Sequence, residues 1–176
     1  MTSRRASTSL LAIAAALLAP ASAAAQISDT AVKAAFIPKF ARYVTWPASA
    51  ASRTNGPLAI CVIGEDPFGN ALDKAAASQS VDGRAFVVKR LSSASGASGC
   101  SIAFVDGSHA GETLAALRRQ PILTVTDSRG SAQRGVIHFA VVGGRVRFFI
   151  DNSEAQARGL TISSRLLALA IGVNQK

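Results

Sequence analysis

Reactive residue types are scarce in this chain of 176 residues, which has two histidines, two cysteines and one tryptophan. Neither histidine belongs to an H-x-x-x-H motif or to a Cys/His cluster, and a structural zinc site needs about four ligands. The sequence therefore predicts no metal and no other cofactor. The nucleophile motif G-x-S-x-G is also absent, which is evidence against an α/β-hydrolase.

The histidines and the paired carboxylates are interpreted as structural. We expect His109 at the surface and His138 packed or at the edge of a hairpin. Gly64–Gly69 follows an expected strand and opens a helix, where α/β sheets hold phosphate. It fits neither G-x-G-x-x-G nor G-x-x-x-x-G-K-[ST], and two carboxylates at the helix start would repel an anion. Turn and cap roles are expected there, and the pairs Glu65 with Asp66 and Asp106 with Asp127 are interpreted as caps and strand ends.

Long apolar runs are absent, and the one near the N-terminus is short. Leu10–Ala19 follows Arg4 and Arg5 and precedes the small residues Ala21–Ala25, which fit an A-x-A cleavage rule. A membrane anchor or a core helix is the alternative, but a spanning helix needs roughly 20 apolar residues. Residues 1–25 are therefore predicted to be a signal peptide for general secretion. The mature chain, residues 26–176, is predicted to be a single periplasmic domain.

Acidic residues are few, 10 against 19 lysines and arginines, which gives a formal charge of +9, or +7 once Arg4 and Arg5 are removed. Nucleic-acid binding is not expected, because the cations are scattered and are not interleaved with aromatic residues. They are interpreted as a solubilising shell. The scattered cations include Lys33, Lys39, Arg42, Arg84, Lys89, Arg90, Arg118, Arg119, Arg145 and Arg147.

The two cysteines, Cys61 and Cys100, lie at the edges of apolar runs. Adjacent parallel strands would bring such positions within bonding range, and an oxidising compartment favours pairing. Two independent buried thiols are the alternative. Without a C-x-x-C spacing, the expected disulfide is structural.

Periodicity predicts alternating helices and strands. A helix is expected over 31–44, capped by Asp29 or Thr30, and Val32, Phe36, Phe40 and Val44 form its apolar stripe. We expect a kink at Pro38 and a linker over 48–56. Asp66 and Pro67 are expected to start the next helix. The other expected helices are 68–77, 111–119, a short one to Arg158 capped by Asp151 or Asn152, and 165–171 capped by Ser163 or Ser164. Residues 92–99 are expected to form either a helix or a loop. The expected strands are 58–63, 86–91, 102–105 and 122–126.

A hairpin is the clearest local prediction, because Gly143-Gly144 separates two alternating apolar runs, 135–142 and 145–151. The turn predicts that Val141 faces Val146, Phe139 faces Phe148 and Ile137 faces Ile150 on an apolar face, with Ala140–Arg147 and His138–Phe149 on the mixed face. The whole pattern predicts a three-layer α/β sandwich with a mixed sheet.

Two segments are not explained by packing alone. Phe36–Trp46 contains Phe40, Tyr43 and Trp46, and aromatic residues of this kind often anchor interfaces, although a core helix also accounts for them. Ala157–Leu167 sets leucines beside Arg158 and Arg165, with the leucines expected in the core and the arginines solvated.

Taken together, six segments resemble the YfiR family of periplasmic regulators. The segments are VKAAFIPKFARYVTWP (32–47), LAICVIGEDPFG (58–69), GCSIAFV (99–105), ILTVTDS (122–128), VRFFIDN (146–152) and ARGLTISSRLLALA (157–170). The resemblance implies a Rossmann-like fold, a homodimer and no catalysis. The chain lacks the second cysteine pair of better-known relatives, so only Cys61–Cys100 carries over.

The resemblance further implies binding to the periplasmic part of an inner-membrane diguanylate cyclase or sensor kinase, which lowers cyclic di-GMP and biofilm formation; an outer-membrane lipoprotein is a further candidate partner. The candidate contact residues are Phe40, Tyr43, Trp46, Arg158 and Arg165. The competing hypothesis is a small-molecule-binding module or an enzyme that uses strand-end loops near Glu65, Asp66 and Asp127.

Overall fold

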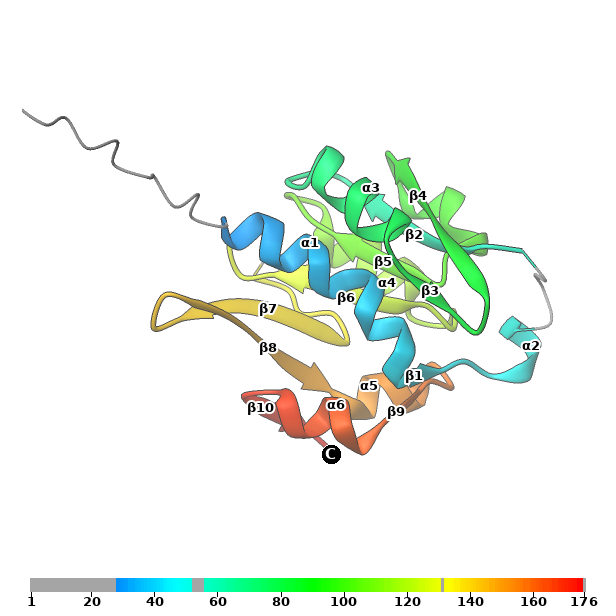
Figure 1. Ribbon diagram of the computed structural model, residues 1–176. Coiled ribbons are helices and arrows are strands. Elements are labelled where there is room, and N and C mark those ends of the chain that lie inside the picture. Colours follow the sequence, from blue (N-terminus) through cyan, green and yellow to red (C-terminus); the bar gives the residue numbers. More distant parts are fainter. Residues whose placement is uncertain (1–27, 52–55, 131, 176) are drawn as a thin grey trace, which may run out of the picture.

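A mixed sheet of eight strands forms the centre of the protein, as the computed structural model shows for residues 28–51, 56–130 and 132–175 (Figure 1). The predicted signal peptide and its cleavage site lie outside these residues. The strand order across the sheet is β10-β8-β7-β6-β5-β2-β4-β3. The strands are β2 (Leu58–Ile63), β3 (Ser80–Val81), β4 (Arg84–Leu91), β5 (Ile102–Val105), β6 (Leu123–Asp127), β7 (Ile137–Val142), β8 (Arg145–Asp151) and β10 (Gly172–Asn174).

Five of these strands, β4, β2, β5, β6 and β7, are mutually parallel. Numbered along the chain, their spatial order is 2-1-3-4-5, the order of flavodoxin-like doubly wound sheets. In such sheets the usual ligand crevice lies at the carboxyl ends of the strands, where the order reverses. Here that point lies between β2 and β5.

Helical elements cover both faces of the sheet, which gives the three layers that the sequence predicted. On one face, α1 (Asp29–Phe40) and α3 (Asn70–Ala77) pack on alternate strand residues such as Ile60 and Phe104. On the other face, the 3-10 helix η2 (Ala94–Gly99) and α4 (Ala110–Leu117) pack on the intervening residues, among them Cys61 and Ala103. Burial on both faces explains why β2 is an unbroken apolar run.

The disulfide joins Cys61 in β2 to Cys100 directly before β5, with the two Cα atoms 5.9 Å apart. β2 and β5 are adjacent parallel strands, paired from Ile60 with Ile102 to Ile63 with Val105. The predicted pairing is confirmed for the predicted reason, since parallel neighbours bring the two sulfur atoms together.

The hairpin prediction is also confirmed in register. Ile137, Phe139 and Val141 face Ile150, Phe148 and Val146. Gly143 and Gly144 have φ of 57° and 69°, as a turn that matches strand twist requires.

The first helix differs from its prediction in its cap, its end and its buried face. Ser28 caps it, through its side chain and the amide of Ala31, where Asp29 or Thr30 was expected. It continues through Pro38, ends at Phe40 and passes into the 3-10 turn η1 (Ala41–Tyr43). The predicted stripe is right for Phe40 and Val44, which are buried, and wrong for Val32 and Phe36, which are only partly buried. The other buried residues of the helix are Lys33, Ala34, Ile37 and Pro38.

The remaining helices agree with prediction to within a few residues. α5 (Asn152–Ala157) is capped by Asp151 and α6 (Ser164–Leu169) by Ser163, which settles both alternatives. Two predictions are wrong. Asp66 and Pro67 do not start α3, which begins at Asn70 after Gly69. The segment expected to be a linker contains the short helix α2 (Ala48–Ala51). Four short strands were not predicted: β1 (Val44–Thr45), β3, β9 (Thr161–Ile162) and β10.

Candidate functional site

The two segments that packing alone did not explain lie side by side. β1 and β9 form an antiparallel pair in which Val44 faces Ile162 and Thr45 faces Thr161 (Figure 1). The amide of Ser163 donates to the carbonyl of Tyr43 over 2.8 Å. We call this region, Tyr43–Trp46 with Thr161–Arg165, the β1–β9 junction. It contains the candidate contact residues Tyr43, Trp46 and Arg165, whereas Phe40 and Arg158 lie outside it.

Phe40 does not lie at the surface of the junction. Its ring is 1% exposed and lies within 6.0 Å of Phe36, 5.7 Å of Phe139 and 5.4 Å of Phe148, measured between ring centroids. These contacts anchor α1 on β7 and β8. Phe40 therefore supports the junction from beneath and does not contact a partner directly in this conformation.

Arg158 is also buried, 5% exposed, so the expectation that both arginines are solvated is wrong for this residue. Its guanidinium donates to Glu154 through Nε over 3.0 Å and through Nη1 to the carbonyl of Leu117 over 2.7 Å. Burial lowers the pKa of Arg158, although Glu154 opposes that shift. Arg158 holds α5 against the end of α4.

The other three candidates reach solvent. Tyr43 and Trp46 are half-buried and pack against the larger core, and Arg165 is exposed on α6. The indole Nε1 of Trp46 is covered yet has no hydrogen-bond acceptor in the described part of the chain. An unsatisfied buried donor of this kind costs about 1–3 kcal/mol.

A buried ion pair at the carboxyl edge of the sheet was missed by sequence reasoning. The ammonium of Lys33 donates to the carboxylate of Asp127, at the end of β6, and Lys33 is 1% exposed. Lys33 is therefore not part of the solubilising shell. Its helical spacing with Ile37, Phe40 and Val44 was the available signal, since 33, 37, 40 and 44 also define one helix face.

The loops after β2 and β5 meet at the point where the strand order reverses. A Cβ atom on Gly64 would lie 2.2 Å from the carbonyl oxygen of Asp106, and one on Gly130 would lie 1.5 Å from the Asp106 carboxylate. The chain's own loops thus fill the usual ligand position of this fold. Burial raises the pKa of Asp106, and the nearby charges of Asp127 and Glu65 act in the same direction.

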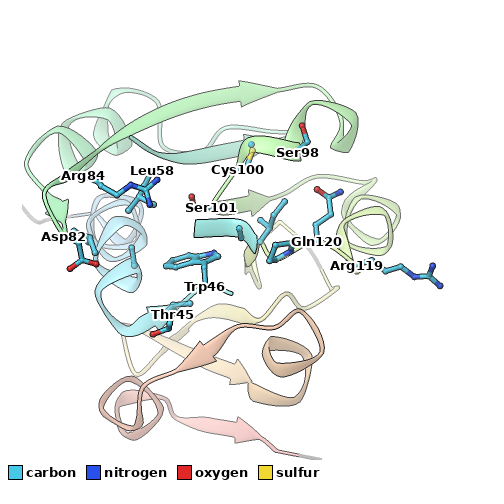
Figure 2. A pocket seen from close by; sticks show the side chains of 17 residues that line it. Thr45, Trp46, Leu58, Asp82, Arg84, Ser98, Cys100, Ser101, Arg119 and Gln120 are labelled. Atoms are coloured by element: carbon cyan, nitrogen blue, oxygen red, sulfur yellow. The ribbon is translucent and has the colours of Figure 1, made fainter. Parts of the chain in front are cut away.

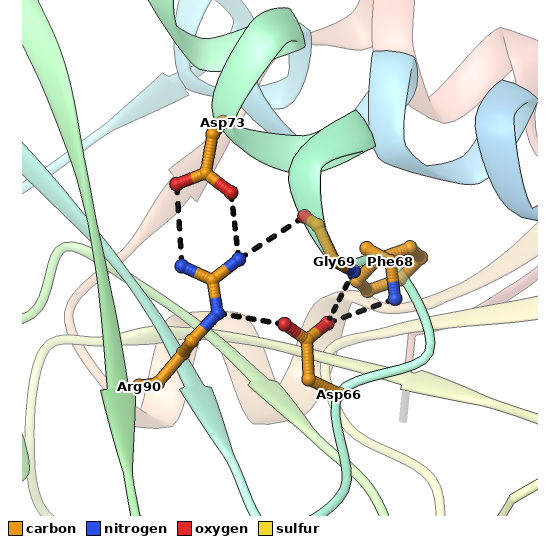
Figure 3. A network of polar contacts seen from close by, with 5 residues as sticks. All are labelled: Asp66, Phe68, Gly69, Asp73 and Arg90. Atoms are coloured by element: carbon orange, nitrogen blue, oxygen red, sulfur yellow. Dashed lines mark hydrogen bonds and ion pairs between the residues drawn. The ribbon is translucent and has the colours of Figure 1, made fainter.

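Asp66 has the turn role that was expected, although it does not cap α3. One of its carboxylate oxygens accepts from the amides of Phe68 and Gly69, and the other accepts from Arg90 over 2.7 Å (Figure 3). Arg90 also binds Asp73 with two hydrogen bonds, 3.2 and 2.6 Å. The hydrogen bond from Arg90 lowers the pKa of Asp73. This clamp fixes the β2–α3 loop to β4.

The histidines lie in ordinary settings. His138 is buried, and its Nδ1 lies 2.8 Å from the hydroxyl of Thr126. Burial lowers the pKa of His138. His109 is exposed beside Glu112. Within the described ranges, three or more His, Cys, Asp or Glu side chains do not gather as a metal ion would require.

None of the helices in the described part of the chain has the length and apolar character needed to cross a bilayer.

Comparison with known proteins gives the family. A search of curated proteins found no match. A family model described as YfiR/HmsC-like matches residues 30–171, which run from the second residue of α1 to just beyond α6. The chain belongs to the YfiR/HmsC-like family.

Proposed function

We propose that this protein is a periplasmic, non-enzymatic regulator that binds the periplasmic part of an inner-membrane diguanylate cyclase or related sensor and restrains it. Membership of a regulatory rather than catalytic family, over residues 30–171, is the observation that carries the proposal. Restraint works by differential binding: a partner held more tightly in its inactive state shifts towards that state. The cellular result is less cyclic di-GMP and less biofilm.

The β1–β9 junction supports this function as the contact surface. It presents Tyr43 and Trp46, residue types that dominate binding energy at interfaces, next to the exposed cation of Arg165. Phe40 and Arg158 fix the elements beneath it. We therefore assign direct contact to Tyr43, Trp46 and Arg165, and a supporting role to Phe40 and Arg158.

Homodimer formation is part of the same proposal. Leu169 and Ile171 are large apolar side chains with exposed fractions of 62% and 43%. They precede β10, the outermost strand on that side of the sheet. Exposed apolar side chains beside a sheet edge favour pairing with another chain. The double variant Leu169→Lys with Ile171→Lys is expected to be a monomer when its mass is measured by light scattering. A variant that remains a dimer would place the interface elsewhere.

The test in cells is a deletion complemented with variants. Loss of the gene is expected to raise cyclic di-GMP and biofilm, and the wild-type gene is expected to restore both. Arg165→Glu is expected to fail in complementation. Lys89→Glu, an equivalent charge reversal on the exposed part of β4, is expected to succeed. Unchanged cyclic di-GMP and biofilm after deletion would refute the cyclase assignment.

A pull-down identifies the partner. Tagged mature protein is expected to retain a transmembrane protein with a periplasmic sensor domain from solubilised membranes. Retention of a small molecule and of no membrane protein would instead favour a ligand-binding module.

A further inference from the structure

A cavity of about 400 Å³ lies at the amino edge of the parallel strands, opposite the filled carboxyl edge (Figure 2). Its walls come from η1, β1 and α2, the start of β2, the β3–β4 turn, and the segments before β5 and β6. The volume falls within the roughly 300–1,000 Å³ that small-molecule sites occupy.

One side of the cavity is apolar. Val44, Leu58 and Ile122 line it, and the ring of Trp46 stands at the centre of the view in Figure 2. An indole face gives a flat surface suited to a ring or a short aliphatic body. The indole Nε1 is covered, so Trp46 offers the cavity its apolar ring and not its N–H group.

The charged residues of the wall favour an anion. Among the described residues they are Arg84, Arg119 and Asp82, two cations against one carboxylate. Arg84 extends from β4 towards Leu58, and its Nε donates to the carbonyl of Gly56 over 2.8 Å, which fixes the guanidinium plane (Figure 2). Arg119 extends away from the other labelled side chains. Arg84 is therefore the residue placed to receive an anionic group.

We propose that this cavity binds a small organic carboxylate whose apolar body is about the size of one ring. The carboxylate lies at Arg84, since a planar guanidinium matches a planar carboxylate in shape and charge. The apolar body lies against Trp46 and Leu58. Ser101 and Gln120, both on the wall, supply neutral hydrogen-bonding groups around it. The proposal concerns the isolated protein and does not depend on the identity of any membrane partner.

Trp46 is the only tryptophan of the chain, so its intrinsic fluorescence reports on the cavity. Purified mature protein is titrated with phenylacetate while tryptophan emission is followed. A saturable change in intensity or wavelength is expected. Phenethylamine and benzyl alcohol, which carry the same ring without the anion, and acetate, which carries the anion without the ring, are each expected to need at least about tenfold higher concentration.

Variants locate the site. Arg84→Gln is expected to weaken phenylacetate binding about tenfold, since a hydrogen bond to a charged group contributes about 1.5–3 kcal/mol. Ser101→Leu, which places a larger side chain on the cavity wall, is expected to abolish the saturable change. Lys89→Gln, at the other end of the strand that carries Arg84, is expected to leave binding unchanged.

Three results would overturn the proposal. They are a linear, non-saturating response to phenylacetate, an equal response to phenethylamine, and unchanged phenylacetate binding in folded Arg84→Gln protein. Circular dichroism on each variant checks the fold, and Lys89→Gln provides the reference for an intact site.

Discussion

The two edges of the parallel sheet are built in opposite ways. At the carboxyl edge, where doubly wound folds usually bind ligands, loops at Gly64 and Gly130 lie directly on Asp106, and Lys33 is buried against Asp127. At the amino edge, Trp46 and Arg84 line an open cavity. The contrast shows that a familiar fold does not fix where its binding surface lies.

The two edges also differ in what stabilises them. The disulfide reaches the amino edge, where Cys100 lines the cavity, and its removal is expected to have the largest effect on stability. Cys61→Ala with Cys100→Ala removes a link between residues 39 apart in sequence. A chain-entropy estimate gives a loss of about 4 kcal/mol in the free energy of unfolding. Urea unfolding with and without a thiol reductant measures it. The reductant is expected to destabilise the wild type alone; a wild type insensitive to reductant would show that the link contributes little.

Close packing at the carboxyl edge is tested by Gly64→Ala. The new Cβ atom would meet the backbone carbonyl of Asp106, and φ at this position is 93°. Strain and overpacking together predict a loss of about 3 kcal/mol in unfolding free energy. Gly83→Ala is the matched control, because φ there is also positive and the surrounding space is open. Equal losses in the two variants would mean that the loops are not closely packed.

The buried pair at the same edge predicts a loss of similar size. Lys33→Met leaves Asp127 buried without its cation, which is expected to cost about 3 kcal/mol at neutral pH. Adding Asp127→Asn is expected to recover part of that loss, because no unpaired charge remains. If the double variant were less stable than Lys33→Met in urea unfolding, unpaired charge would not be the cause.

The smallest expected effect is a gain in stability from Asp106→Asn. Burial raises the pKa of Asp106 in the folded protein. The charged form is therefore disfavoured on folding, and the stability present below the unfolded-state pKa is lost as pH rises through the folded-state pKa. The asparagine variant should unfold at a higher temperature than wild type at pH 7, with the difference vanishing below about pH 4. A difference independent of pH would assign the effect to packing.

Local signals explain which parts of the fold were predictable. The Gly143-Gly144 turn and the alternating runs beside it specify a register without reference to the rest of the chain. Cys61 and Cys100 lie on runs long enough to be recognised as strands. β1, β3, β9 and β10 have two or three residues each, which is too short for a periodic pattern to predict a strand.

The candidate site was predictable in outline and not in detail. Both segments of the β1–β9 junction were recognised, yet their pairing was not, because it joins residues more than a hundred positions apart. The sequence predicts that Lys33 and Arg158 are solvated. Both are buried, because Lys33 pairs with Asp127 and Arg158 binds Glu154 and the carbonyl of Leu117. A single sequence does not show which carboxylate compensates a buried cation.

Site-specific photo-crosslinking at position 165 tests the central claim, that this protein acts by contacting a membrane sensor through the β1–β9 junction. A photoreactive phenylalanine analogue replaces Arg165 in cells, and Lys89 on β4 is the control position. The account predicts an adduct with an inner-membrane cyclase or sensor at position 165 and none at position 89. Adducts of equal yield at both positions, or none at 165 while the cellular phenotype persists, would contradict it.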